Sequence, residues 1–296
     1  MSTPPFVELP QRVIRTSLAT ARGEFAALRA DPPPDATAYA GTRNQVLLVP
    51  GYSGSKEDFI ALLEPIAAAG HPVVAIDQRG QLDTPGPAAE DAYTTAALGA
   101  DVRAMLDVLT ETGPVHLFGH SFGGLVTRAA LLSDPSGVLS YTLLGSGPGG
   151  IVGARQRHAR LLVSVVARFG TQAVGRAMQQ FEVLRPSPKP APEVAAFMHD
   201  RYARSSPHAL VAMARAVLSE PDRADELALF RLPMLVVHGE DDDAWPPHMQ
   251  EEMAKRLDAQ YEVLADAGHS PNVDVPEQLV KTLLHFWDGV EREGPR

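Results

Sequence analysis

A serine stands between glycines in the pentapeptide Gly-His-Ser-Phe-Gly, residues 119–123, directly after the apolar run 114–118. A sharp turn from a strand into a helix would hold such a serine above the edge of a sheet, and the flanking glycines relieve the crowding of that turn. A serine hydroxyl becomes a useful nucleophile only beside a base that is itself oriented by a carboxylate. The pattern therefore predicts Ser121 as a nucleophile, and the alternative is an ordinary strand end built from turn residues.

Carboxylates and a histidine follow two later apolar runs, in the chain order that this chemistry takes after a strand–turn–helix serine. The segment 238–247, His-Gly-Glu-Asp-Asp-Asp-Ala-Trp-Pro-Pro, continues the run 234–239. The segment 267–270, Ala-Gly-His-Ser, follows the run 261–264. His269 is therefore the candidate base, and a surface loop histidine is the alternative. The carboxylate that would orient it is one of Asp241, Asp242 and Asp243.

Six apolar runs rich in Val, Ile and Leu are predicted to be the strands that position these residues: 45–50, 72–77, 114–120, 141–145, 234–239 and 261–264. Continuous apolar runs are typical of a parallel sheet that is covered on both faces. Apolar residues at helical spacing occupy the segments between them: 55–69, 95–111 and 274–288. This alternation predicts a doubly wound α/β domain. Residues 11–30 alternate more loosely, which predicts an antiparallel hairpin at the edge of the sheet.

The stretch 147–230 breaks this alternation because it contains no clear strand pattern. Helical spacing is found instead in four segments: 154–169, 171–184, 192–203 and 207–219. The simplest interpretation is an all-helical cap inserted between two strands of one sheet, lying over the strand ends. The predicted domain organisation is therefore a core made of residues 1–146 and 231–296, with residues 147–230 as the cap.

Composition excludes several classes of function. The formal net charge of −10 argues against nucleic-acid binding, which requires a basic surface. The chain has no cysteine, so disulfides, a cysteine nucleophile and zinc–thiolate sites are all excluded. No apolar run is long enough for a membrane helix, and the first residues, Met-Ser-Thr-Pro-Pro, lack the basic and apolar regions of a signal peptide. A cytoplasmic protein without a membrane partner is expected.

On these motifs the chain resembles the α/β-hydrolase fold superfamily over residues 40–290. The acid loop of that family commonly reads Gly-x-x-Asp-x-x-x-Pro. Placed on Gly239 and Pro246, this pattern favours Asp242, with Asp241 and Asp243 as alternatives. The family's histidine usually follows a glycine, as His269 does. The resemblance thus implies a triad of Ser121, His269 and Asp242.

The resemblance also implies an oxyanion hole made of two backbone N–H groups. One belongs to the residue after the nucleophile, here Phe122. The other comes from an early loop that the family often writes His-Gly-x-x-Gly and that reads Pro-Gly-Tyr-Ser-Gly at residues 50–54. Proline replaces the usual histidine, but the N–H donor would be Tyr52. Substrate contacts are expected from the side chains of Tyr52, Ser53 and His120, and ordinary turn residues are the alternative.

The nucleophile type narrows the activities that the resemblance implies. A serine argues against haloalkane dehalogenases and epoxide hydrolases, which use aspartate, and the lack of cysteine argues against the dienelactone type. A carboxylesterase-like enzyme is expected, which cleaves an ester, lactone or thioester of a small to medium apolar substrate through an acyl-enzyme. No metal or organic cofactor is needed. The alternatives are a C–C bond hydrolase or lyase with the same triad, a biosynthetic thioesterase or cyclase, and a non-catalytic ligand-binding homologue.

The predicted cap differs in charge from the rest of the chain. Residues 151–204 contain nine Arg and Lys against three Asp and Glu, although the whole protein is negative. Arginines commonly just solvate helix faces, which is one interpretation. The other is attraction for an anionic substrate or for an acidic carrier protein. The sequence predicts neither the substrate's identity nor the oligomeric state.

Overall fold

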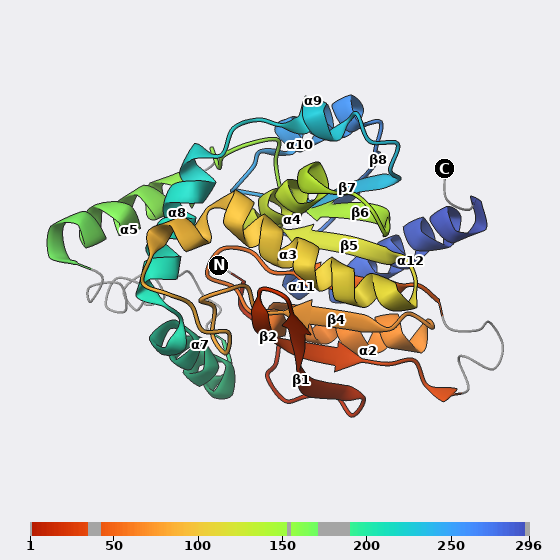
Figure 1. The fold of residues 1–296 in the computed structure, drawn as a ribbon, viewed down its shortest axis with the longest axis horizontal. Helices are drawn as coiled ribbons and strands as arrows, with labels where there is room; N and C mark the ends of the chain where they lie inside the picture. Colours follow the sequence, from red (N-terminus) through yellow and green to blue (C-terminus); the bar gives the residue numbers. More distant parts are fainter. Residues whose placement is uncertain (1, 35–42, 153–154, 171–189, 294–296) are drawn as a thin grey trace.

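The computed structural model describes residues 2–34, 43–152, 155–170 and 190–293, which are arranged around one eight-stranded sheet (Figure 1). The strand order is β1-β2-β4-β3-β5-β6-β7-β8. Six of these strands run parallel to one another: β3 Gln45–Val49, β4 Val73–Ile76, β5 Val115–His120, β6 Val138–Leu144, β7 Met234–Gly239 and β8 Gln260–Leu264. Each of the six predicted strands is confirmed, with shifts of a few residues at the ends.

The hairpin predicted at the sheet edge is also present. Strands β1 Val13–Thr20 and β2 Gly23–Ala30 pair antiparallel, and β2 then pairs antiparallel with β4. Gly23, with φ of 130°, follows the tight turn in a conformation that side-chain-bearing residues rarely adopt. The hairpin makes the sheet mostly, rather than wholly, parallel.

Helices cover both faces of the sheet, which is why the strands read as continuous apolar runs. Along β3, Leu47 and Val49 belong to the apolar cluster beneath helices α3 Thr95–Leu109, α4 Phe122–Ser133 and α10 Pro247–Leu257. Val46 and Leu48 belong to the opposite cluster, beneath helices α2 Ile60–Ala68 and α12 Pro276–Glu293. Short helical turns complete the core: η1 Lys56–Phe59, η2 Glu90–Tyr93, η3 Thr110–Thr112 and α11 Pro271–Asp274. This is the doubly wound α/β architecture that the alternation predicts.

The described helices between β6 and β7 form the inserted cap, as expected. They are α5 Arg155–Phe169, α7 Pro192–Arg204, α8 Pro207–Ser219 and α9 Ala224–Leu227. In Figure 1 the first three lie together at one end of the sheet, while α9 packs against α4 and α10. A separate group of apolar residues, here called the cap cluster, is buried within the cap: Leu162, Val166, Val194, Met198, Tyr202, Leu210, Val211 and Ala214. The helix predicted at 171–184 lies outside the described residues, and the domain boundaries stay a prediction.

A membrane-spanning helix would need a long, strongly apolar segment. Of the helices that the structure describes, none is both long enough and apolar enough to cross a bilayer.

Candidate active site

Ser121 occupies the sharp turn between β5 and α4. Its φ of 56° and ψ of −123° lie in a region that non-glycine residues rarely adopt, so the surrounding structure must hold the strained backbone in place. The flanking glycines are required by packing. A Cβ at Gly119 would collide with the Thr127 hydroxyl, and one at Gly123 would collide with backbone oxygens of Val49 and the residue that follows it. The two glycines of the pattern therefore stand at positions 119 and 123 because the turn leaves no room for a side chain there.

The hydroxyl of Ser121 faces the predicted base. Ser121 Oγ lies 2.8 Å from His269 Nε2, and His269 Nδ1 lies 2.9 Å from Asp242 Oδ1. A carboxylate only accepts hydrogen bonds, so Nδ1 carries the proton that it donates to Asp242. Nε2 of the neutral ring is then free to accept from the serine hydroxyl. The fold thus brings together three residues that are separated by up to 148 positions in the chain.

The three adjacent aspartates have different surroundings. Asp242 is buried, whereas Asp241 and Asp243 are exposed. The carboxylate of Asp243 forms an ion pair with Arg155 of the cap. Asp242 is the member of this run whose carboxylate contacts His269. The family spacing and the geometry therefore favour the same residue.

The contact chain from Ser121 through His269 to Asp242 is here called the relay. The protonation states of its members suit transfer of the serine proton to the histidine. Burial by itself would raise the pKa of Asp242, but the imidazole of His269 and several hydrogen bonds hold it well below its usual range. Those bonds come from the N–H of Ala244 at 2.8 Å and from Gln250 Nε2 at 3.0 Å. Burial lowers the pKa of His269, so its neutral form, which can accept a proton, predominates near pH 7. Asp242 is ionised and His269 is a base.

Gln250 is a supporting residue that the sequence analysis missed. It is fully buried on α10, and its Nε2 donates both to Asp242 and to the carbonyl of Trp245 at 2.8 Å. A signal was available in its spacing, because Gln250 precedes the apolar residues Met253, Ala254 and Leu257 on the same helix face. A polar residue at the apolar position of an amphipathic helix needs a buried partner, and here that partner is Asp242.

The early loop predicted to supply an oxyanion donor lies against the serine. A Cβ at Gly51 would come within 2.9 Å of Ser121 Cβ, so glycine permits this close approach. Two buried glutamines hold the loop by its carbonyls: Gln78 Nε2 donates to Pro50 at 2.7 Å, and Gln81 Nε2 donates to Gly51 at 2.9 Å. Gln78 and Gln81 therefore fix the position of the loop that carries Tyr52.

Phe122, the other predicted oxyanion donor, is the first residue of α4. The first amides of a helix have no acceptor within the helix, and the helix dipole makes that end positive. Its N–H group therefore suits a developing negative charge. Whether Tyr52 and Phe122 act in this way stays a prediction.

The side chains predicted to contact substrate lie in different places. The Tyr52 ring packs against the cap cluster, and its hydroxyl is buried, which keeps its pKa far above the usual value. Ser53 is buried in the same loop with a φ of 56°. His120 lies behind the relay, where its Nε2 donates to the backbone oxygen of His269 at 3.0 Å, and burial lowers its pKa to about 3. His120 thus supports the main chain of His269, and its contact with substrate stays a prediction.

Cations of the cap are partly neutralised. Arg155 pairs with Asp243, Arg201 pairs with Asp58 at 2.7 Å, and Arg204 pairs with Asp83. The remaining arginines of α5 are exposed on its outer surface: Arg157, Arg160 and Arg168. Of these described cap arginines, three are therefore paired with carboxylates and three are exposed, and the attraction for an anionic substrate or an acidic carrier protein stays a prediction.

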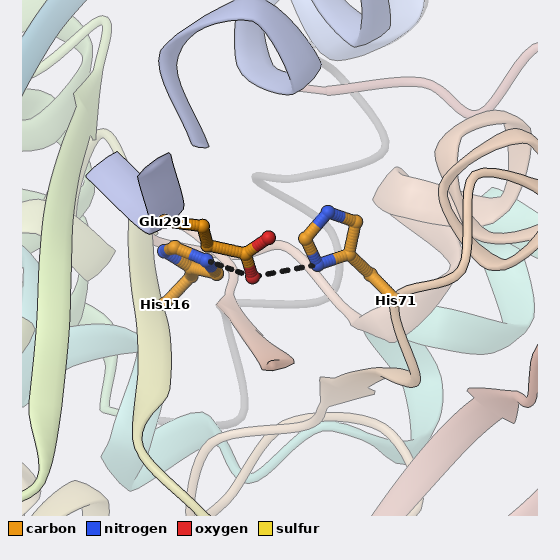
Figure 2. Close-up of side chains that lie close together, drawn as sticks. All are labelled: His71, His116 and Glu291. Atoms are coloured by element: carbon orange, nitrogen blue, oxygen red, sulfur yellow. Dashed lines mark hydrogen bonds and ion pairs between the residues drawn. The ribbon is translucent and has the colours of Figure 1, made fainter. Parts of the chain in front are cut away.

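Among the described residues, one set of potential metal ligands converges, and it lies at the opposite end of the strands (Figure 2). His71, His116 and Glu291 place three ligand atoms within 4.8 Å of one another. Their hydrogen bonds already use those atoms. His71 Nδ1 donates to the Asn44 carbonyl at 2.9 Å, and Glu291 accepts from Asn44 Nδ2 at 2.9 Å and from Arg43 Nε at 2.8 Å. A metal ion would have to displace Arg43 and Asn44, so we interpret this cluster as a structural attachment of α12.

Comparison with known proteins places this geometry in context. Residues 44–276 match the model of a family described as the alpha/beta hydrolase fold. The chain is 31% identical to the "Putative carbamate hydrolase RutD" of Variovorax paradoxus, over 84% of this chain and 93% of that protein. It is 27% identical to the pimeloyl-[acyl-carrier protein] methyl ester esterase of Aeromonas hydrophila, over 75% of this chain and 87% of that protein. A thermophilic esterase from Thermogutta terrifontis shares the fold, with a TM-score of 0.71 and 24% identity. The superposition covers 94% of this chain and 99% of the esterase.

Proposed function

This chain belongs to the alpha/beta hydrolase fold family, and from that premise we propose that it is a serine hydrolase that cleaves a carboxylic ester through an acyl-enzyme. The observation that carries the proposal is the buried contact chain from Ser121 Oγ through His269 to Asp242, at 2.8 and 2.9 Å. Nucleophile and base are within hydrogen-bond distance, and a carboxylate orients the base. These are the relations that acyl transfer by serine requires.

In the proposed mechanism, Ser121 Oγ attacks the ester carbonyl carbon while its proton passes to His269 Nε2. The carbonyl oxygen becomes an oxyanion, which the N–H groups of Phe122 and Tyr52 stabilise. The tetrahedral intermediate then expels the alcohol oxygen, which takes the proton from Nε2, and Ser121 stays acylated. Water repeats the sequence: it gives a proton to His269, attacks the acyl carbon and releases the acid as Ser121 recovers its proton.

Asp242 has a positioning and electrostatic role in this scheme. It fixes the tautomer of His269 by accepting from Nδ1, and its negative charge stabilises the imidazolium that forms when Nε2 takes the serine proton. Its low pKa keeps it ionised throughout.

A carbamate is the second candidate substrate. The favouring observation is the 31% identity to the "Putative carbamate hydrolase RutD" over 84% of this chain. The same nucleophile attacks a carbamate carbonyl without any change in the relay. A p-nitrophenyl carbamate assayed beside p-nitrophenyl esters distinguishes the two, because the preferred class has the higher kcat/KM.

The proposed function is tested with p-nitrophenyl esters of increasing acyl length and with a fluorophosphonate probe. We expect the wild type to hydrolyse part of the series and to be labelled by the probe. Ser121→Ala should lose labelling and at least about 10⁴-fold in kcat. A folded wild-type protein that neither turns over any ester or carbamate nor reacts with the probe would overturn the proposal.

A further inference from the structure

The N-terminal segment lies beside the relay. Ser2 is buried, and its Oγ lies 2.9 Å from the Oγ of Ser270, the residue that follows His269. Arg201 of α7 donates from Nη2 to the Ser2 carbonyl at 2.8 Å. The segment is therefore in contact both with the loop that carries the base and with the cap.

A buried ion pair fixes this arrangement. Arg201 is fully buried, and its Nη1 donates to Asp58 Oδ1 at 2.7 Å, while the carbonyl of Asp58 accepts from Asn272 Nδ2 at 2.7 Å. Breaking a buried pair strongly destabilises a protein, because it leaves an uncompensated charge. The chain is also held farther along, since Val7 packs against the cap cluster and Leu9 packs against the core beneath α2 and α12. Residues 2–9, here called the N-terminal strap, thus have a defined place.

A cavity of about 350 Å³ lies between the strap and the relay. Its described lining residues include Thr3 of the strap, Ser270 and the catalytic candidate His269, together with Arg155 at the start of α5. This volume is within the range of small-molecule sites. Of the three residues Ser121, His269 and Asp242, the cavity is therefore lined by His269, and Thr3 of the strap forms part of its wall.

The chemistry of acyl transfer decides which part of an ester belongs there. His269 Nε2 must give its proton to the leaving oxygen, so the alcohol portion has to lie on the imidazole side of the scissile bond. We propose that this cavity binds the alcohol portion of the substrate and that the strap, through Thr3, limits the size of that alcohol. The inference rests on the proposed function and adds the position and size limit of the leaving group.

The charges around the cavity narrow the class of alcohol. Three carboxylates line it, those of Asp241, Asp243 and Asp274, and the single described cation is Arg155, which is already paired with Asp243. Excess negative charge around a site repels an anionic ligand. The alcohol portion is therefore one without negative charge.

The experiment compares two substitutions of Thr3 on two series of esters. One series consists of acetates of increasingly large alcohols: ethyl, butyl, phenyl and 1-naphthyl. The other consists of p-nitrophenyl esters of increasingly long acids. Thr3→Trp fills the cavity and Thr3→Gly widens it. Thr16→Trp is the matched control, because Thr16 is exposed on β1. Melting temperatures establish that each variant is folded.

Thr3→Trp should reduce kcat/KM for 1-naphthyl acetate by at least about tenfold and that for ethyl acetate by less than about twofold. Thr3→Gly should raise the 1-naphthyl to ethyl ratio, and neither change should alter the acyl-length profile. A shift confined to the acyl series, or none in either series, overturns the alcohol site. Because the Thr16→Trp control must still hydrolyse esters, this result is distinct from failure of the proposed function, in which no protein of the set has activity.

Charge selectivity is measured in the same assay. Phenyl acetate should be hydrolysed with a kcat/KM at least about threefold above that of 4-carboxyphenyl acetate, and 0.5 M NaCl should narrow the gap because salt screens exposed charges. Equal rates, or a preference for the anionic ester, would contradict the assignment of an uncharged alcohol.

Discussion

A serine, a histidine and a carboxylate meet at both ends of the sheet. At the carboxyl ends of the strands these are Ser121, His269 and Asp242. At the amino ends, Ser140 Oγ lies 2.7 Å from His116 Nδ1, and His116 Nε2 lies 3.4 Å from Glu291 Oε1. The same three types of side chain are in contact, yet only the first set has the features of a catalytic site.

Backbone conformation around the serine makes the difference. Ser121 sits on a strained turn with the first amide of α4 beside it, next to a loop whose Gly51 allows close approach. Ser140 lies inside β6, where it is fully buried and paired in register with His116. Strand amides are committed to the ladder, so no donors are left to bind an oxyanion.

The two carboxylates, Asp242 and Glu291, also differ in the contacts they make. Asp242 contacts one imidazole, whereas Glu291 lies between the imidazoles of His71 and His116 (Figure 2). Glu291 also accepts from Arg43 and Asn44. The ring of His116 is also stacked on Trp287, with ring centroids 5.2 Å apart. Contacts among these residue types therefore do not by themselves make a catalytic site; the candidate at Ser121 also has a strained turn with unused amides beside it.

The largest expected effect comes from removing the charge of each carboxylate without changing its shape. Asp242→Asn should lower kcat by about 10³–10⁴-fold, because the amide cannot favour the tautomer that leaves Nε2 free. Glu291→Gln should leave kcat within about twofold and lower the free energy of unfolding by about 1–3 kcal/mol through lost charge-assisted hydrogen bonds. Ester hydrolysis and chemical denaturation measure the two effects. A large loss of kcat in folded Glu291→Gln would contradict the assignment of a catalytic role to Asp242 and a structural role to Glu291.

The next largest difference between the two ends of the sheet is expected in their response to acid. Burial lowers the pKa of His71 to about 4, so the unfolded chain takes up this proton below about pH 6.5 while the folded chain does not. Stability is therefore lost as the pH falls from 6.5 toward 4, by about 2 kcal/mol at pH 5 for this group. Asp58 opposes the trend, since burial raises its pKa to about 6 and the folded state binds its proton first.

His71→Gln isolates this contribution, because it removes the histidine and leaves Asp58 in place. Its unfolding free energy should depend less steeply on pH between 6.5 and 5 than that of the wild type. The acid limb of kcat/KM should be the same in both proteins and lie below pH 6.5, since burial lowers the pKa of His269 at the other end of the sheet. Identical pH slopes of stability would refute the assignment to His71.

The smallest effect is expected from the support of Asp242. Gln250→Ala removes the donor to Asp242 Oδ2 and should lower kcat about tenfold, with little change in KM. The reason is that Asp242, and with it the imidazole of His269, is held less firmly, while all three reacting groups are still present. Gln278→Ala is the matched control on the exposed surface of α12. Equal kcat in the two variants would show that Gln250 supports only the fold.

The sequence by itself determined most of the elements and singled out the candidate reactive residues. Continuous apolar runs specify buried strands and helical spacing specifies their cover, because both patterns are local. The turn at Ser121 and the histidine after Gly268 are equally local signals. The alternation of strands and helices, the helical cap and the family resemblance all follow from such local patterns, and the match over residues 44–276 confirms the family.

Tertiary structure alone decided which distant residues support these elements. Gln78 and Gln81 hold the loop of Tyr52, and Arg201 binds the carbonyl of Ser2, 199 positions away. Helical spacing can indicate that a polar side chain is buried, as it does for Gln250, but it does not identify the partner of that side chain, because the partner is selected by the packing of separate elements. The same limit applies to the two serine–histidine–carboxylate sets, of which the sequence indicated only the one at Ser121: side-chain type is local, but the backbone amides left unused around Ser121 and absent around Ser140 result from the assembled sheet.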